Sequence, residues 1–275
     1  MDSFILNNII SQLMYFIVFL FIAGFIISLL NKLFYGLTNY NKVVLYGTSF
    51  IGTPIHELSH ALMCVIFMHK IHEIKLFQIN DADGVLGYVS HSYNRKNLWA
   101  VIGNFFIGTA PIICGSLLLF FSMKFLMPEA YYEMMLYAED LQTLQGSGFS
   151  FSMILYLLAT AWGFIECIFS TFTFTFGWFA FAFIAMCIAL HMNLSGADLK
   201  GALPSLPFVI IIIVGANLLL GFIASGLYIS YLNFMNMIGS FLLAILIFSL
   251  VISLGYILVV LIIKYGIKLI IKLKR

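Results

Sequence analysis

The chain has 275 residues, of which 63% are hydrophobic and 9% charged. A soluble domain cannot bury so much apolar surface, so we expect one integral membrane domain, residues 1–275, that spans the lipid bilayer several times. The net charge of +2 is too small to suggest a nucleic-acid partner. Composition therefore excludes an ordinary soluble enzyme and a nucleic-acid-binding protein.

The first two predicted membrane spans differ in their content of small residues. The first, at about residues 8–30, is almost continuously apolar. The second, at about residues 43–68, contains Gly47, Gly52 and Pro54. Glycine and proline at membrane depth favour a locally loosened helix or a closely packed neighbour, and either leaves space beside the residues that follow.

Those residues form a His-Glu-x-x-His motif at positions 56–60. With 6 histidines in the chain, the motif is expected by chance about 0.003 times. On a helix His56 and His60 lie one turn apart on one face, where both can bind one metal ion with Glu57 beside them. The spacing is typical of a zinc hydrolase. The alternative is a pair of helix histidines that only hydrogen-bond to neighbouring backbone.

A β-hairpin is predicted within residues 69–97, where two strand-like runs, 73–79 and 85–91, flank a turn-rich joint. A free strand edge near a protease site can pair with an extended peptide. A hairpin that merely packs on the helices is the alternative. The residues that would bind the peptide are Val85, Gly87 and Val89. The histidines of this segment, interpreted as ordinary surface or hairpin residues, are His69, His72 and His91.

The third predicted span, at about residues 98–127, contains small residues that allow close helix packing at Gly103, Gly108 and Ala110. Asn104 is an amide at membrane depth and needs a partner. It either bridges two helices or holds substrate backbone near the metal.

Charge predicts the topology. Residues 128–148 contain four acids and no Lys or Arg, which predicts an acidic loop or surface helix on the non-cytoplasmic side, whereas basic residues follow the second span and close the chain. Residues 149–190 are expected to hold one crossing and a re-entrant or interfacial helix, followed by spans at about 206–231 and 236–263. We therefore predict an all-α polytopic membrane protein with six transmembrane helices, alternatively seven, and a small β-hairpin. The C-terminus would be cytoplasmic, in a bacterial-type cell membrane.

A catalytic zinc ion usually has three protein ligands, so the motif needs one more. Asp198 is the best candidate, because it lies in a polar break between apolar segments on the predicted cytoplasmic side. His191 is an alternative ligand, or a hydrogen-bond partner of Asp198 or of a ligand. Glu166 would reach the site if its segment is re-entrant, and otherwise should be paired or protonated. The four cysteines receive no role.

These features together resemble the site-2 protease class of intramembrane zinc metalloproteases, over residues 43–201. The resemblance implies Zn²⁺ bound by His56, His60 and Asp198, with Glu57 as the general base. It implies hydrolysis of peptide bonds in membrane-embedded protein or peptide substrates.

The chain departs from this family at its distal motif. The family usually has Asn-Pro followed by Leu-Asp-Gly, whereas here no proline follows Asn193 and Asp198 precedes Leu-Lys-Gly. Two other functions are considered. A transporter or metal carrier would bind an ion in transit, but no second His/Glu copy is present in the sequence. An inactive zinc-binding scaffold would not need the base Glu57.

Overall fold

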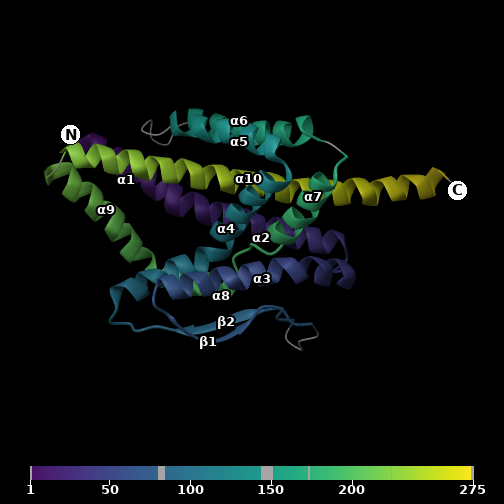
Figure 1. Cartoon of the computed structure of the whole chain (residues 1–275), viewed down its shortest axis with the longest axis horizontal. Helices are drawn as coiled ribbons and strands as arrows, with labels where there is room; N and C mark the ends of the chain where they lie inside the picture. Colours follow the sequence, from purple (N-terminus) through teal and green to yellow (C-terminus); the bar gives the residue numbers. More distant parts are fainter. Residues whose placement is uncertain (1, 80–83, 144–150, 173, 224, 274–275) are drawn as a thin grey trace.

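The computed structural model describes residues 2–79, 84–143, 151–172, 174–223 and 225–273, and it is mainly helical (Figure 1). The elements in chain order are α1 (Asp2–Leu13), the π-helical turn η1 (Met14–Val18), α2 (Phe19–Leu37), α3 (Lys42–Ile66), β1 (Lys70–Lys75), β2 (Tyr88–Ser92), α4 (Leu98–Leu126), α5 (Pro128–Thr143), α6 (Phe151–Ser170), α7 (Phe176–Ala189), α8 (Gly196–Ala202), the 3-10 turn η2 (Leu203–Ser205), α9 (Leu206–Ile223) and α10 (Ser225–Leu273). The predicted combination of helices with one small hairpin is confirmed.

Four helical segments in the described residues are long and apolar enough to cross a membrane. They are Ser3–Leu37, Leu98–Leu126, Gly196–Ile223 and Gly226–Gly266. The motif helix α3 has 25 residues but is not among them, because its His, Glu, Ser, Thr and Gly residues dilute its apolar side chains. The chain is thus compatible with a membrane protein, while the count of six or seven spans stays a prediction.

One boundary between predicted spans differs from the expected one. The break expected between residues 231 and 236 is wrong, because α10 continues through it. Leu232 is buried there in a cluster with Ile5 and Tyr228, which favours an unbroken helix. In the acidic segment, residues 128–143 form the helix α5, whose apolar face packs into the core, whereas residues 144–150 lie outside the described part.

The helices form layers around α4. In Figure 1 α10 and the α1–α2 helix pass through the middle, α5 and α6 cover one side, and α3, α8 and the hairpin form the other. Small residues allow the close contacts that hold helices together in lipid. A Cβ atom at Gly103 would collide with the Phe67 side chain between α4 and the end of α3. A buried hydrogen bond of 2.9 Å from Ser249 to Ser116 also joins α10 to α4.

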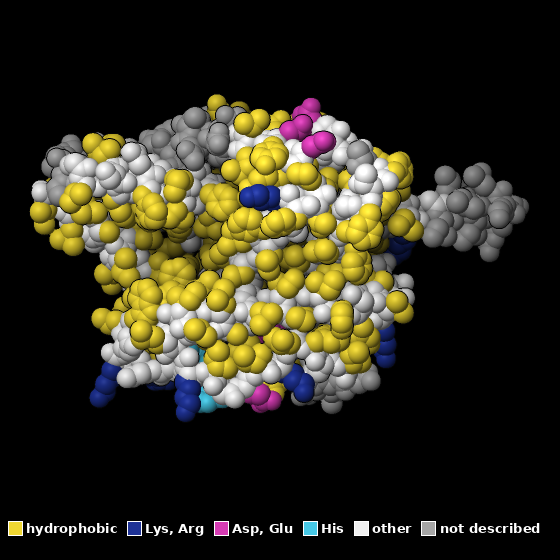
Figure 2. All heavy atoms as spheres, viewed as in Figure 1, with side chains coloured by type: hydrophobic (Ala, Val, Ile, Leu, Met, Phe, Trp, Pro, Cys, Tyr) yellow, Lys and Arg dark blue, Asp and Glu magenta, His cyan; other side chains and the backbone are white. Residues whose placement is uncertain are grey.

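The surface is rich in exposed hydrophobic side chains. Figure 2 shows them over most of one face, with several Lys and Arg side chains along the hairpin edge and a group of acidic side chains at the opposite edge. Large exposed residues include Phe25, Ile211 and Ile223. Apolar surface of this extent is favourable against lipid and unfavourable against water.

The hairpin pairs at different positions from those expected. Its antiparallel register places Lys70 opposite Ser92 and Lys75 opposite Tyr88, with an irregularity after Ile71. The backbone N–H of Gln78 donates to Leu86 at 2.8 Å, so pairing continues beyond the strands. The first strand begins earlier than predicted because the chain reverses sharply at the end of α3.

Candidate metal centre

The motif lies in the second half of α3, which begins at a well-defined cap. The Asn41 side chain accepts a hydrogen bond from the Val43 backbone N–H at 2.9 Å. At Gly52 a Cβ atom would collide with the Cys187 carbonyl and the His191 ring. Glycine therefore allows α3 to approach α7 closely, just before the motif begins.

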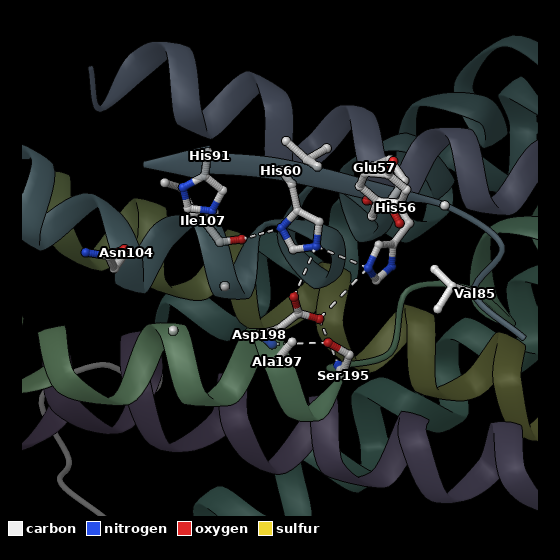
Figure 3. Close-up of a pocket in the computed structure, with 15 residues that line it drawn as sticks. His56, Glu57, His60, Val85, His91, Asn104, Ile107, Ser195, Ala197 and Asp198 are labelled. Atoms are coloured by element: carbon white, nitrogen blue, oxygen red, sulfur yellow. Dashed lines mark hydrogen bonds and ion pairs between the residues drawn. The ribbon is translucent and has the colours of Figure 1, made fainter. Parts of the chain in front are cut away.

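The two motif histidines and Asp198 converge on one point (Figure 3). The Nε2 atoms of His56 and His60 are 3.1 Å apart. Asp198 Oδ1 is 3.2 Å from His60 Nε2, and Asp198 Oδ2 is 3.9 Å from His56 Nε2. The three side chains are largely buried and could hold one metal ion.

The outer nitrogens of both rings contact backbone carbonyls. His56 Nδ1 is 2.6 Å from the carbonyl oxygen of His191, and His60 Nδ1 is 2.8 Å from that of Ile107. A carbonyl oxygen can only accept, so each Nδ1 carries the proton and donates it. In the neutral rings both Nε2 lone pairs then face each other and the Asp198 carboxylate. A cation between them removes this repulsion, either a metal ion or a proton on His60 Nε2, which lies 3.2 Å from Asp198 Oδ1.

The Asp198 carboxylate is oriented by the start of α8. The Ser195 backbone N–H donates to Asp198 Oδ2 at 2.8 Å, and the Asp198 backbone N–H donates to Ser195 Oγ at 3.1 Å. This reciprocal pair is a capping box. Ser195 was not among the residues predicted from the sequence, although the Ser-x-x-Asp pattern could have revealed it. A Cβ atom at Gly108 would lie 2.8 Å from Ala202 Cβ, so glycine also lets α4 approach α8.

A pocket of about 430 Å³ opens beside these three residues. Residues of α3, α4, α8 and the second arm of the hairpin line it (Figure 3). The proposed substrate-binding residues that it contains are Val85, Gly87, Val89 and Asn104. The hairpin therefore borders the candidate metal site.

Glu57 is 7% exposed and lines the same pocket. No hydrogen bond or ion pair of Glu57 occurs within the described residues. A Cβ atom at Gly87 would lie 2.8 Å from both Glu57 Cγ and Thr53 Cγ2, and 2.9 Å from the Lys75 carbonyl. Glycine at position 87 is thus what lets the hairpin lie directly against Glu57. The nearby Thr53 Oγ1 is buried and has no partner among the described atoms.

The His191 side chain points away from the three converging groups. Its Nδ1 donates to the Cys187 carbonyl at 2.9 Å, and its Nε2 is 2.9 Å from Ser49 Oγ. His191 acts on the site through its backbone, since its carbonyl oxygen fixes the ring of His56. The structure therefore places the His191 side chain outside the group of three, as a partner of the candidate ligand His56.

Of the two remaining candidates, Asn104 lies at the pocket and Glu166 lies far from it. Asn104 lines the pocket, and its amide donates to the Val101 carbonyl of its own helix at 3.2 Å, with no bridge to another helix among the described contacts. Glu166 is exposed on α6, which packs on α5 and α10 on the far side of the molecule (Figure 1). Glu166 therefore cannot reach the pocket in this fold, because its segment does not re-enter the core beside α3.

His91 on β2 also lines the pocket. Burial first, and then the neighbouring His69, lower the pKa of the His91 imidazole below its ordinary value. The ring is therefore neutral near pH 7, and one of its nitrogens carries a lone pair.

Comparisons of the chain with protein-family models, with curated proteins and with solved structures give no match. The functional interpretation consequently depends on the motif and on the geometry of the pocket.

Proposed function

We propose that this protein is a zinc-dependent intramembrane endopeptidase of the site-2 protease type. The observation that carries the proposal is the convergence of two histidine Nε2 atoms on the Asp198 carboxylate, with Glu57 in the same pocket. Two imidazoles and one carboxylate, with one position left open, form a ligand set that catalytic zinc commonly uses.

The distances suit zinc. With Zn–N bonds of about 2.0–2.1 Å, two nitrogen ligands of a tetrahedral ion lie roughly 3.3 Å apart. The separations of His60 Nε2 from His56 Nε2, 3.1 Å, and from Asp198 Oδ1, 3.2 Å, are close to this value. A zinc ion held here would supply Lewis acidity to a peptide carbonyl and to water.

Glu57 is suited to move the proton. Glu57 follows His56 in the chain. Its carboxylate faces the pocket and has no ion-pair partner among the described residues. It would accept a proton from the attacking water and deliver it to the leaving amine. An ion carrier or a structural metal site does not account for a buried, unpaired acid in this position.

The hairpin offers a way to hold the substrate. In the described two-stranded sheet β2 pairs with β1 along one edge, while its residues Tyr88 and Val89 line the pocket. The carbonyls of a helical substrate are engaged in hydrogen bonds, so the segment must unwind before cleavage. An unwound segment that adds to the β2 edge would pass beside the metal ligands.

Metal content and cleavage test the proposal together. We expect His60→Ala to lose one zinc ion per chain relative to wild type and to lose cleavage of membrane-spanning peptides, because two of the three ligands cannot hold the ion. Elemental analysis of detergent-purified protein measures the zinc content, and mass spectrometry of a peptide library measures cleavage. His72→Ala, at an exposed hairpin histidine, is the control and should behave as wild type. Unchanged zinc content and cleavage in His60→Ala would contradict the proposal.

Gly87→Ala tests the contact between hairpin and base. The added methyl group would force Glu57 or the backbone of Lys75 to move. We expect cleavage to fall about 10²-fold, the effect of a displacement near 1 Å, with zinc retained. The control is Gly47→Ala on the same helix as Glu57, where a Cβ atom meets nothing within 4 Å. Equal kcat/KM values for the two variants would show that the hairpin does not position Glu57.

A further inference from the structure

A second group of metal-ligating side chains lies next to the first. The Cys64 sulfur and one ring nitrogen each of His69 and His91 all lie within 4.8 Å of one another. Cys64 follows His60 by four residues on α3, so the same helix face carries residues of both groups. Cys64 is completely buried and His69 is 6% exposed, which corrects the interpretation of His69 as an ordinary surface residue.

The end of α3 places His69 over Cys64. The His69 backbone N–H donates to the Cys64 carbonyl at 2.8 Å, and that of Met68 donates to Val65 at 3.2 Å. This pattern is a Schellman motif, which requires a left-handed residue between helix and strand. Met68 takes that conformation with φ of 58°, where glycine is usual. The protein thus keeps a strained residue at the point that turns His69 back toward Cys64.

The ring protons leave a ligand atom available on His69. Its Nε2 is 2.8 Å from the Ala100 carbonyl oxygen, so Nε2 carries the proton and Nδ1 has the lone pair. That Nδ1 is 3.0 Å from His91 Nδ1. The Tyr93 ring stacks on His69 with centroids 4.9 Å apart and restrains its orientation. The His69 ring is therefore held in place by two partners outside the group, the Ala100 carbonyl and the Tyr93 ring.

We propose that Cys64, His69 and His91 form a second site for a divalent transition metal of the zinc class. Thiolate with imidazole suits such an ion, whereas hard cations prefer oxygen. On binding, the Cys64 thiol releases its proton to solvent as the metal–sulfur bond forms. The ion joins the end of α3 to β2, and so fixes the hairpin that borders the first site. Metal binding here does not depend on the proposed peptidase activity.

Cobalt(II) distinguishes the two sites. A thiolate ligand gives cobalt an intense charge-transfer band in the near ultraviolet, whereas His56, His60 and Asp198 supply only nitrogen and oxygen. We expect wild type to bind two cobalt ions per chain and to show the band. His56→Ala should lose one ion and keep the band, and Cys64→Ser should lose one ion together with the band.

Two further variants control the experiment. Cys114→Ser removes a thiol outside the group and should keep the band. His91→Ala leaves Cys64 in place and should also lose the band, which keeps the test decisive if Cys64→Ser does not fold. A wild-type protein that binds cobalt without the band would overturn the second site and reduce His69 and His91 to a hydrogen-bonded pair. A wild-type protein that binds no cobalt would overturn both the second site and the proposed zinc peptidase.

Discussion

Glu57→Gln is expected to lower peptide cleavage by about 10²–10⁴-fold, the usual contribution of a general acid–base group, while zinc stays bound. Glutamine has nearly the same shape, so it should fill the space between α3 and Gly87 without displacing the hairpin. It cannot accept the proton of water. The measurement is kcat/KM on a cleavable membrane peptide, together with zinc content.

The matched control is Glu73→Gln, which changes an exposed acid on β1 in the same way. It should cleave at the wild-type rate. A Glu57→Gln protein that cleaves as fast as this control would remove Glu57 from the chemistry and return the metal site to the transport or scaffold functions. A variant that binds substrate without cleaving it would also serve to trap natural substrates.

The sequence predicted which side chains meet at the candidate metal centre but not what orients them. Helical periodicity places His56 and His60 on one face, and the need for a third ligand pointed to Asp198. Both histidine rings, however, are oriented by backbone carbonyls, those of His191 and Ile107. A carbonyl has no residue identity, so no motif could reveal these contacts before the helices were packed.

The fold, too, could be predicted only in part from the sequence. A long apolar run predicted the bounds of α4 closely. The first strand of the hairpin begins just after the Schellman motif at Met68. That motif is usually recognised in a sequence by a glycine, which is absent here. The sequence predicted separate spans at about residues 206–231 and 236–263. In the structure α10 continues through the expected break, where Leu232 packs against Ile5 of α1.

His69 was misjudged for a related reason. It occurs in a polar segment, which usually indicates an exposed residue. The turn after α3 instead folds it back against the start of α4, where its Nε2 donates to the Ala100 carbonyl. Position relative to a helix end, rather than the polarity of neighbours in sequence, decided its burial.

Asp198→Asn is expected to weaken zinc binding by at least about 100-fold, beyond the usual loss from removing an outer partner of a ligand. Asp198 Oδ2 accepts the Ser195 N–H, while Oδ1 faces His60 Nε2. In asparagine one of these positions becomes an NH₂ group. If the amide oxygen keeps the cap, the NH₂ points at the metal. If it turns to the metal, two N–H groups meet at the cap.

Competition with a zinc chelator measures this affinity, and Ser195→Ala is its control. That variant keeps the carboxylate and removes only the hydroxyl that accepts the Asp198 backbone N–H. It should cost about 1 kcal/mol of stability, as lost helix caps do. Its zinc affinity should fall by no more than about 10–100-fold, since it alters only the support of a ligand. An Asp198→Asn protein with a zinc affinity equal to or higher than that of Ser195→Ala would mean that the carboxylate orients the site without binding the metal, and the third ligand would have to come from the pocket itself.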